Sequence, residues 1–182
     1  MGLVLALALL QDDTQLYTFA AGTTWTYQVD DRGKAGKMIL KVLEEKDGKI
    51  WLETQEFKDA ASTEPRTKKM VWYVEENCLA WGGVTDDDTV KPLWRIYKFG
   101  SKKDETWAGG GESRSAQATN LGTEEVTVPL GTYKEAIHTK VKTKETETVE
   151  FHLVPKVGLV KFVRNDGDRK IVMELKEFTA GK

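Results

Sequence analysis

Hydrophobic and polar residues alternate along most of the chain after Tyr17, as they do in strands that bury one face. In the segment TTWTYQVD, Trp25, Tyr27 and Val29 take alternate positions, with polar residues between them. The same alternation recurs in KMILKVLEE, IWLETQEF, AIHTKVKT, TVEFHL and KIVMELKEF. The pattern therefore predicts a succession of amphipathic β-strands, each with one face in a core.

Short turn sequences separate these alternating segments. KDGK at residues 46–49 and NDGD at residues 165–168 each place an Asp-Gly pair between two segments, which favours a tight hairpin. Long apolar stripes with a helical period are absent from the sequence. We expect an all-β, mainly antiparallel fold: one strongly curved sheet or open β-barrel of about a dozen strands, with little helix.

The alternation weakens between residues 100 and 122, where the sequence is polar and rich in glycine. This stretch suits a mobile loop or a hinge. The segments FAAGTTW and FGSKKDETW also resemble each other, since each runs from an aromatic residue through a glycine and a polar stretch to a tryptophan. We expect one β domain over residues 17–182. The sequence also fits a domain made of two similar halves with a hinge near residues 100–122.

The first sixteen residues have a different character. Residues 2–10 form an apolar run that is too short to span a bilayer as a helix and matches the hydrophobic region of a signal peptide. A basic start and a clean small-x-small cleavage site are missing, so a short arm packed on the domain is the alternative. We predict a signal-peptide-like leader at residues 1–16 and a periplasmic or secreted location. No cysteine follows the run to accept a lipid anchor, and no second apolar segment suggests a transmembrane span.

Charge and cysteine content narrow the choice of partners. The 27 basic and 29 acidic residues give a net charge of -2, which provides no broad basic field for nucleic acid or an anionic membrane. The single cysteine, Cys78, rules out an intrachain disulfide. No histidine or basic cluster lies beside it in sequence, so we expect a small hydrophobic residue at a strand end.

The sequence contains no recognisable catalytic or metal-binding motif. His138 and His152 fall on the polar faces of their predicted strands, and we expect them to be solvated, because a zinc site needs three or four protein ligands. No Gly-x-Ser-x-Gly element is present, and Asp86–Asp88 lacks the spacing of a calcium loop. The glycines of AGGGES precede no lysine in the position that a phosphate-binding loop requires. We predict no catalytic residue, metal site or cofactor, although a pair of carboxylates for glycoside cleavage stays open.

Aromatic residues gather in the middle third of the chain and are the best candidates for a binding surface. Adjacent strand residues point to opposite faces, so Trp72 and Tyr73 lie on different sides of their strand. One side packs in the core, and the other could line a groove, stack on a sugar or hold a lipid chain. Ordinary packing beneath a curved sheet is the alternative. The predicted ligand-binding residues are Trp72, Tyr73, Trp81, Trp94, Tyr97 and Trp107.

Three segments together suggest a family. They contain Gly-x-x-Trp-x-Tyr at residues 22–27, Val-Pro-x-Gly-Thr-Tyr at 128–133 and Pro-x-Val-Gly-Leu-Val-Lys at 155–161. In this order and spacing they resemble bacterial secreted proteins and lipoproteins of unknown function, a β-rich family loosely akin to the open-barrel carriers of lipoprotein and lipid trafficking. The chain departs from that pattern at Leu130 and Val154, where alanine is expected, and in lacking a lipobox cysteine.

These observations favour a non-enzymatic, extracytoplasmic domain that binds a ligand or partner through an apolar, aromatic groove. An apolar small molecule, a lipid or an envelope protein would be its partner, and nucleic acid would not. A structural domain of the cell envelope is the first alternative, and a carbohydrate-active hydrolase is the second.

Overall fold

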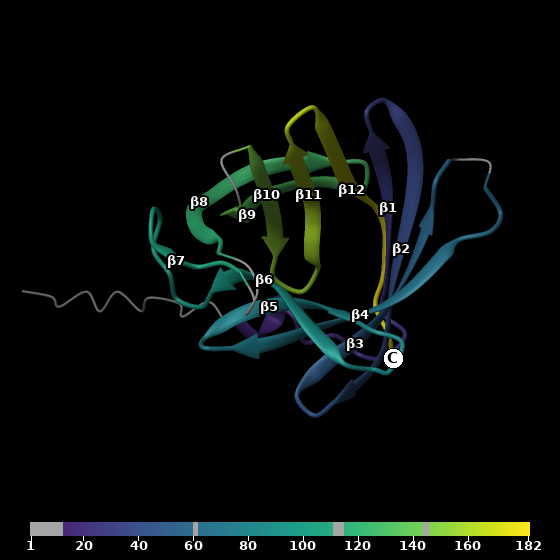
Figure 1. The fold of residues 1–182 in the computed structure, drawn as a ribbon, viewed down its shortest axis with the longest axis horizontal. Helices are drawn as coiled ribbons and strands as arrows, with labels where there is room; N and C mark the ends of the chain where they lie inside the picture. The colour runs from purple at the N-terminus through teal and green to yellow at the C-terminus, as the bar shows by residue number, and fades with distance from the viewer. Residues whose placement is uncertain (1–12, 60–61, 111–114, 144–145) are drawn as a thin grey trace, which may run out of the picture.

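A computed structural model describes residues 13–59, 62–110, 115–143 and 146–182. Twelve antiparallel strands form one sheet, which curves into a nearly closed barrel (Figure 1). In the described residues the helical structure is a single 3-10 turn, η1 (Asp13–Leu16). The prediction of an all-β fold of about a dozen strands is therefore confirmed. The strands are β1 (Thr24–Asp31), β2 (Lys34–Lys46), β3 (Lys49–Phe57), β4 (Arg66–Glu75), β5 (Cys78–Val84), β6 (Val90–Lys98), β7 (Thr106–Ala108), β8 (Gln117–Val128), β9 (Gly131–Lys142), β10 (Glu147–Val154), β11 (Gly158–Asp166) and β12 (Arg169–Thr179).

The strand order divides the sheet into two meanders of six strands. It runs β6-β5-β4-β3-β2-β1-β12-β11-β10-β9-β8-β7, so each strand pairs with its sequence neighbours within a meander. The first and last strands join the two meanders, and Thr24 of β1 lies opposite Thr179 of β12. The edges of the sheet are consequently β6 and β7, which come from the middle of the chain.

Local sequence explains where the strands turn. Asp47 and Gly48, between β2 and β3, both have positive φ, 53° and 69°, as a two-residue hairpin with an Asp-Gly turn requires. Strand β10 ends at Val154, immediately before Pro155, which has no amide hydrogen to give to the ladder. Strands β11 and β12 likewise pair from Asp166 and Arg169, on either side of the second Asp-Gly turn sequence, so the hairpins predicted at KDGK and NDGD are confirmed.

The two edges of the sheet approach each other along a seam with few hydrogen bonds. One isolated bridge joins Trp94 of β6 to Gly110. The Arg95 amide donates to the Gly109 carbonyl at 3.1 Å, and the Trp107 indole donates to the Arg95 carbonyl at 3.0 Å. Because a full ladder is absent here, we call this contact between β6 and β7–β9 the seam and regard it as the weakest join in the barrel.

A buried side chain from β9 adds one more hydrogen bond to the seam. Ile96 is the extra residue of a β-bulge in β6, so its carbonyl falls outside the β5–β6 ladder. The hydroxyl of Thr139, which is fully buried, donates to that carbonyl at 2.6 Å. This bond supplies a partner for a backbone group that would otherwise be unsatisfied.

Replacing Thr139 with valine is expected to lower the free energy of unfolding by about 1–2 kcal/mol. Valine keeps the shape but removes the donor and leaves the Ile96 carbonyl buried without it. Urea denaturation measures the effect. Thr127→Val is the matched control, because Thr127 is exposed on β8 and bonds only to Thr132 in the contacts described, so its loss should be a few tenths of a kcal/mol. Equal losses in the two variants would contradict the role given to Thr139.

Apolar side chains on the inner face of the sheet fill the barrel. Trp25 and Tyr27 of β1 are fully buried, as their alternation predicts. The Trp25 indole donates to the Val157 carbonyl at 2.6 Å, and the Tyr27 hydroxyl donates to the Leu159 carbonyl at 2.8 Å. These bonds cross the interior from β1 to the start of β11, so the indole N–H of Trp25 and the hydroxyl of Tyr27 both find acceptors within the core.

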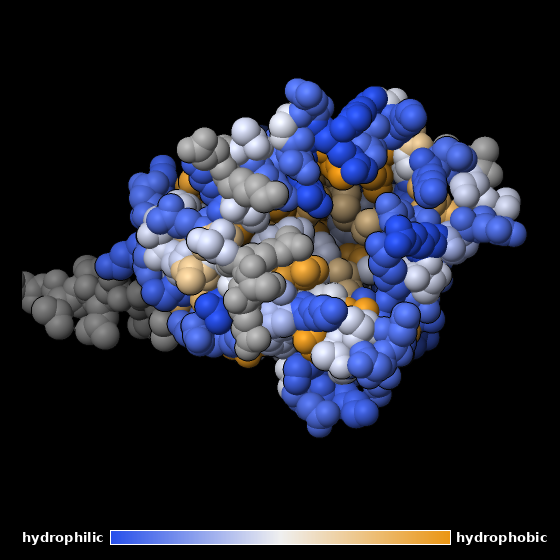
Figure 2. Space-filling view, in the orientation of Figure 1, coloured by the Kyte–Doolittle hydropathy of each residue, from blue (hydrophilic) through white to orange (hydrophobic). Residues whose placement is uncertain are grey.

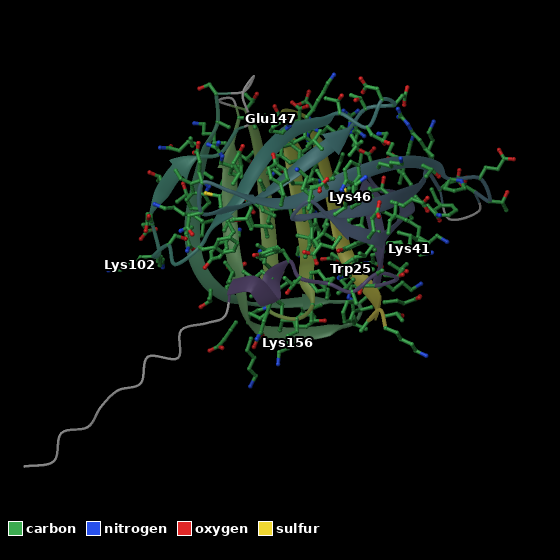
Figure 3. The ribbon with its side chains drawn as sticks, turned by 90° about the horizontal axis from the view of Figure 1, so that it is seen from below. Trp25, Lys41, Lys46, Lys102, Glu147 and Lys156 are labelled. Atoms are coloured by element: carbon green, nitrogen blue, oxygen red, sulfur yellow. The ribbon has the colours of Figure 1, made fainter. Side chains whose placement is uncertain are left out.

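The segment before β1 packs against the end of the barrel where β10 turns into β11. Leu16 is buried, and the Phe19 ring meets the Trp25 ring edge to face with centroids 4.8 Å apart. The Lys156 amide donates to the Gln15 carbonyl at 2.8 Å, and Figure 3 shows η1 on the side of the barrel where Lys156 lies. The predicted leader, residues 1–16, otherwise lies outside the described residues. Within the described ranges no helix is long and apolar enough to cross a membrane.

Candidate functional site

Three of the predicted binding residues form one row across neighbouring strands. Trp72 of β4 lies opposite Trp81 of β5, and Trp81 lies opposite Trp94 of β6. All three belong to the interior core and are 2%, 7% and 8% exposed, respectively. We call these residues the tryptophan row. The alternation of the strands brings them together, because each occupies an inward position of its strand.

The tryptophan row packs against aromatic rings from the opposite wall of the barrel. The Trp81 ring lies 6.0 Å from the rings of both Phe151 and Phe162, between centroids, in edge-to-face geometry. At one end of the row, the centroid of the Trp72 ring lies 5.6 Å from that of the Trp25 ring. Such contacts contribute about 0.5–1.5 kcal/mol each beyond the area they bury. The row is therefore part of a continuous aromatic interior.

The indole nitrogens of the tryptophan row find no acceptor within the described ranges. The indole nitrogens of Trp72, Trp81 and Trp94 are buried, and among the described residues none of them finds a hydrogen-bond partner. Trp25 and Trp107 differ, because their indoles donate to backbone carbonyls. A buried donor without a partner costs about 1–3 kcal/mol. Three such donors in one row are the strongest chemical feature of the interior.

The other predicted binding residues are distributed differently. Tyr97 is buried in the interior beside Phe99, with ring centroids 5.8 Å apart, and Trp107 is half-buried at the seam. Tyr73 lies on the outer face of the sheet, where it forms a small second cluster with Val71 and Ala80. The structure thus separates Tyr73 from the tryptophan row, as the opposite directions of adjacent strand residues predict.

The surface has a recess over the interior and a shallow depression elsewhere. Figure 2 shows polar side chains around the rim of one face and apolar surface in a recess near its middle. A depression of about 230 Å³ lies over β1, β2 and β12, away from the six predicted aromatic residues. Its lining residues are Gln28, Val29, Asp30, Gly33, Ala35, Gly36, Val172 and Glu174.

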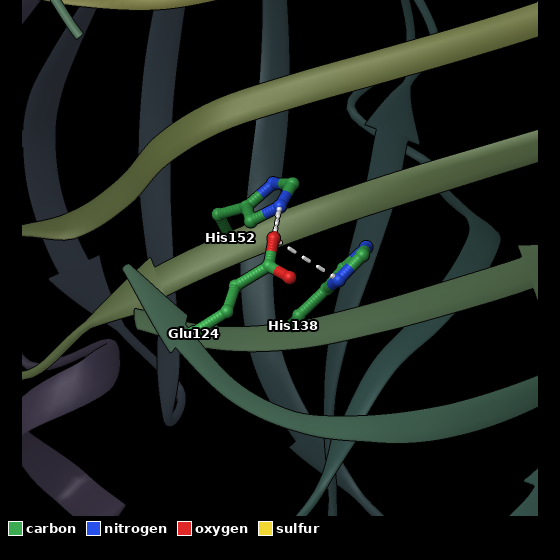
Figure 4. A group of neighbouring side chains, drawn as sticks. All are labelled: Glu124, His138 and His152. Carbon is green, nitrogen blue, oxygen red and sulfur yellow. Dashed lines mark hydrogen bonds and ion pairs between the residues drawn. The ribbon is translucent and has the colours of Figure 1, made fainter. Parts of the chain in front are cut away.

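A group of ionisable side chains lies on the outer face of β8, β9 and β10. His138 and His152 are directly opposite each other in β9 and β10, and their rings stack with centroids 4.2 Å apart and an interplanar angle of 20°. Glu124 of β8 reaches both rings through one carboxylate oxygen, Oε1 (Figure 4). Oε1 lies 2.9 Å from His152 Nε2 and 3.3 Å from His138 Nδ1. We call these three residues the His–Glu cluster.

A second carboxylate borders this cluster. Glu150 Oε2 lies 3.5 Å from His138 Nε2, and Glu150 Oε1 lies 3.2 Å from Lys140 Nζ. The interactions with His138 and Lys140 lower the pKa of Glu150 to about 2, although partial burial opposes ionisation. Glu150 is consequently ionised at neutral pH and lies beside the edge of the His138 ring that faces away from Glu124.

The expectation that the histidines are solvated is wrong for His152, which is 4% exposed, and His138 is also half-buried. His152 does point outward, but the His138 ring stacks on it and Glu124 contacts its edge. Burial lowers the pKa of His152, and its electrostatic interactions with His138 and Lys161 act in the same direction, while Glu124 opposes them. The ring is therefore neutral near pH 7.

The sequence analysis did not identify Glu124 as a site residue. The pairing of the two histidines, in contrast, could have been predicted from their positions in the β9–β10 hairpin. In the β9–β10 hairpin, Lys142 lies opposite Thr148, so residues at equal distances from the turn face each other. His138 and His152 are each four positions beyond that pair. Glu124 carries no such signal, because the β8–β9 pairing contains two bulges that shift its register.

Solved structures with the same fold are known. No family model and no curated protein matches this sequence. A presumed exported protein with a YmcC-like fold from Bacteroides fragilis has a TM-score of 0.58 and 11% identity, covering 90% of this chain and 98% of its own. A presumed lipoprotein from Parabacteroides distasonis has a TM-score of 0.58 and 13% identity over the same shares of the two chains. These likenesses establish a shared β-barrel-like fold.

Proposed function

We propose that this protein is an extracytoplasmic, non-enzymatic binding domain whose interior takes an apolar molecule that carries a hydrogen-bond acceptor. The observation that carries the proposal is the tryptophan row, in which three buried indole N–H groups find no acceptor in the described part of the chain. Small-molecule sites are typically apolar with a few well-placed polar groups. Because apolar side chains fill the barrel, the rings of the interior have to move apart to admit a ligand. A ligand with a carbonyl or carboxyl oxygen would supply a hydrogen-bond acceptor for these indole N–H groups.

The surroundings of the row indicate the class of ligand. Aromatic rings from both walls, including Phe151 and Phe162, offer faces and edges against which an acyl chain can pack. The side chains packed around the tryptophan row are hydrophobic. The buried carboxylate of Glu147 on β10 is already paired with Arg164 at 2.8 Å. A fatty acid or an acyl ester therefore fits better than a sugar or a nucleotide, because a polar ligand would need more hydrogen-bond partners than indoles provide.

The seam provides the easiest route into the interior. It consists of one isolated bridge and a few hydrogen bonds, whereas every other pair of neighbouring strands shares a ladder. Segments that few hydrogen bonds hold to their neighbours open at a lower free energy than strands in a continuous ladder. We infer that β6 separates from β7 and β8 when a ligand enters, which brings Trp94 of the row to the opening.

The extracytoplasmic location is supported by two lines of argument. The apolar run at residues 2–10 has the length and composition of a signal-peptide core. Two proteins of the same fold are named as a presumed exported protein and a presumed lipoprotein. Both lines are independent of the tryptophan row, so the location and the ligand are tested separately.

Two measurements test the ligand. Native mass spectrometry and organic extraction of the purified protein are expected to yield a co-purifying acylated molecule. Titration with a dansyl-labelled fatty acid, displaced by oleic acid, then gives an affinity. Trp81→Phe keeps an apolar ring and removes the indole N–H, so we expect the affinity to fall about 5–10-fold, which corresponds to one lost hydrogen bond.

Trp51→Phe is the matched control. Trp51 lies on β3 and packs against the outer-face cluster, and its indole nitrogen is also buried without a partner among the described residues. The same substitution there should leave fatty-acid binding unchanged. Protein that is free of extractable lipid and does not bind the probe would overturn the proposal. Equal losses of affinity in Trp81→Phe and Trp51→Phe would show that the tryptophan row is not the place where the ligand binds.

A further inference from the structure

We propose that Glu124, His138 and His152 form a binding site for a divalent transition-metal ion, with Zn²⁺ as the preferred ion and the fourth coordination position open. The ligand atoms are Glu124 Oε1, His138 Nδ1 and His152 Nε2, and suitable atoms of the three residues lie within 4.8 Å of one another. Two imidazoles and one carboxylate are a common ligand set of zinc sites that keep an exchangeable position.

The two separations between Glu124 and the histidine nitrogens suit a tetrahedral ion. Two ligands that are each about 2.0–2.1 Å from a tetrahedral Zn²⁺ lie about 3.3 Å from each other. The Glu124 oxygen lies 3.3 Å from the His138 nitrogen and 2.9 Å from the His152 nitrogen. The stacked rings need to tilt toward a common point, and the χ2 torsion of histidine permits this because its energy well is broad.

Glu150 is placed where an outer-shell partner of a metal-bound His138 would lie. Histidines that bind metals usually give their other ring N–H to a carboxylate, which fixes the tautomer and the direction of the ring. Glu150 Oε2 lies 3.5 Å from His138 Nε2, on the opposite side of the ring from Glu124, and Nε2 has no hydrogen-bond partner among the described residues. A small movement of the ring toward Glu150 would form this hydrogen bond and leave the His138 Nδ1 lone pair available to an ion.

The charges around the cluster leave room for a cation. In the described part of the chain, the ion-pair partners of the Glu124 carboxylate are the two histidines. The nearby lysines are engaged elsewhere: Lys140 pairs with Glu150 at 3.2 Å, and Lys161 pairs with Glu174 at 2.9 Å. The Glu124 side chain is 48% exposed, so an ion can reach the site from solvent and bind a water or an outside donor at its fourth position.

The metal site and the proposed lipid site are on opposite faces of the same sheet. Phe151 points into the interior beside the tryptophan row, and His152, the next residue, points outward. Metal binding at the His–Glu cluster therefore does not depend on lipid binding in the interior, and the two are tested separately.

The test uses the metal alone on protein without a polyhistidine tag. After removal of bound ions with EDTA, isothermal titration with Zn²⁺ is expected to give one site per chain, and Co²⁺ is expected to produce the visible absorption of a tetrahedral complex. Glu124→Gln and His138→Gln should each weaken Zn²⁺ binding by about 100-fold, because each removes a direct ligand. Glu150→Gln should weaken it by about 10-fold, as expected for an outer-shell partner.

Glu125→Gln is the matched control, since it removes the same charge from the neighbouring exposed residue and should leave the affinity unchanged. Circular dichroism of every variant confirms that the fold is kept. The proposal is overturned if the wild-type protein takes up less than one Zn²⁺ per chain at saturation. It is also overturned if Glu124→Gln and His138→Gln bind Zn²⁺ as tightly as Glu125→Gln does.

Discussion

Replacing Trp25 with alanine is expected to lower the free energy of unfolding by about 5 kcal/mol, the largest effect of any single substitution considered. Removing a fully buried aromatic ring costs about 3–5 kcal/mol through lost transfer free energy and the cavity left behind. Trp25 is fully buried and contacts the rings of Phe19, Trp72 and Phe178. Alanine also leaves the Val157 carbonyl without its 2.6 Å hydrogen bond, which adds about 1 kcal/mol.

Urea denaturation followed by circular dichroism measures this loss. Trp25→Phe keeps most of the ring contacts but not the hydrogen bond, so its loss should be less than half that of the alanine variant. Leu130→Ala serves as a surface control, because Leu130 is 43% exposed and its truncation should change the free energy by at most about 0.5 kcal/mol. A loss below about 2 kcal/mol for Trp25→Ala would show that the interior is loosely packed there.

Gly109→Ala is expected to cost about 2–3 kcal/mol and to act on the seam. A β-carbon at Gly109 would lie 2.8 Å from both the β-carbon and the amide nitrogen of Ala118, and 3.1 Å from a methyl group of Val141. The Ala118 backbone belongs to β8 and cannot move aside without disturbing its ladder. The Gly109 carbonyl accepts the Arg95 amide, so the displacement would weaken a main hydrogen bond of the seam.

Hydrogen exchange distinguishes a local effect from a general one. In Gly109→Ala, exchange at the Arg95 amide should accelerate at least about tenfold more than exchange at Tyr27 in the β1 ladder. Gly83→Ala is the control on β5, because a β-carbon there meets only Leu93 Cδ1, at an ordinary 3.7 Å. Uniform acceleration across the sheet would mean that the seam does not open independently of the rest of the barrel.

Local patterns were enough to predict the strands and the direction of their side chains. Trp25 and Tyr27 alternate with threonines, and the inward face that this implies is the face that is buried. Cys78 was expected as a small hydrophobic residue at a strand end, and it is the buried first residue of β5. These features depend on neighbours in sequence, so the sequence contains the information directly.

Contacts between distant strands could not be predicted in the same way. The burial of His152 depends on Glu124 of β8, whose register is set by bulges rather than by simple alternation. The seam likewise depends on how far the sheet curves before β6 meets β8, which is a sum of small twists over twelve strands. Strand β7 was missed as well, because its three residues lie in a polar, glycine-rich stretch without an alternating pattern. The division into two similar halves with a hinge near residues 100–122 stays a prediction.

The pairing of the first strand with the last makes completion of the sheet a late event in folding. Thr24 and Thr179 meet across the join between the two meanders, so that join has to wait until nearly the whole chain has left the ribosome. Contacts between residues so far apart in sequence raise the contact order, and proteins of high contact order fold slowly. For a protein that is exported, as proposed, slow closure is useful, because the chain would stay unfolded long enough to be threaded across a membrane and would complete its barrel on the far side.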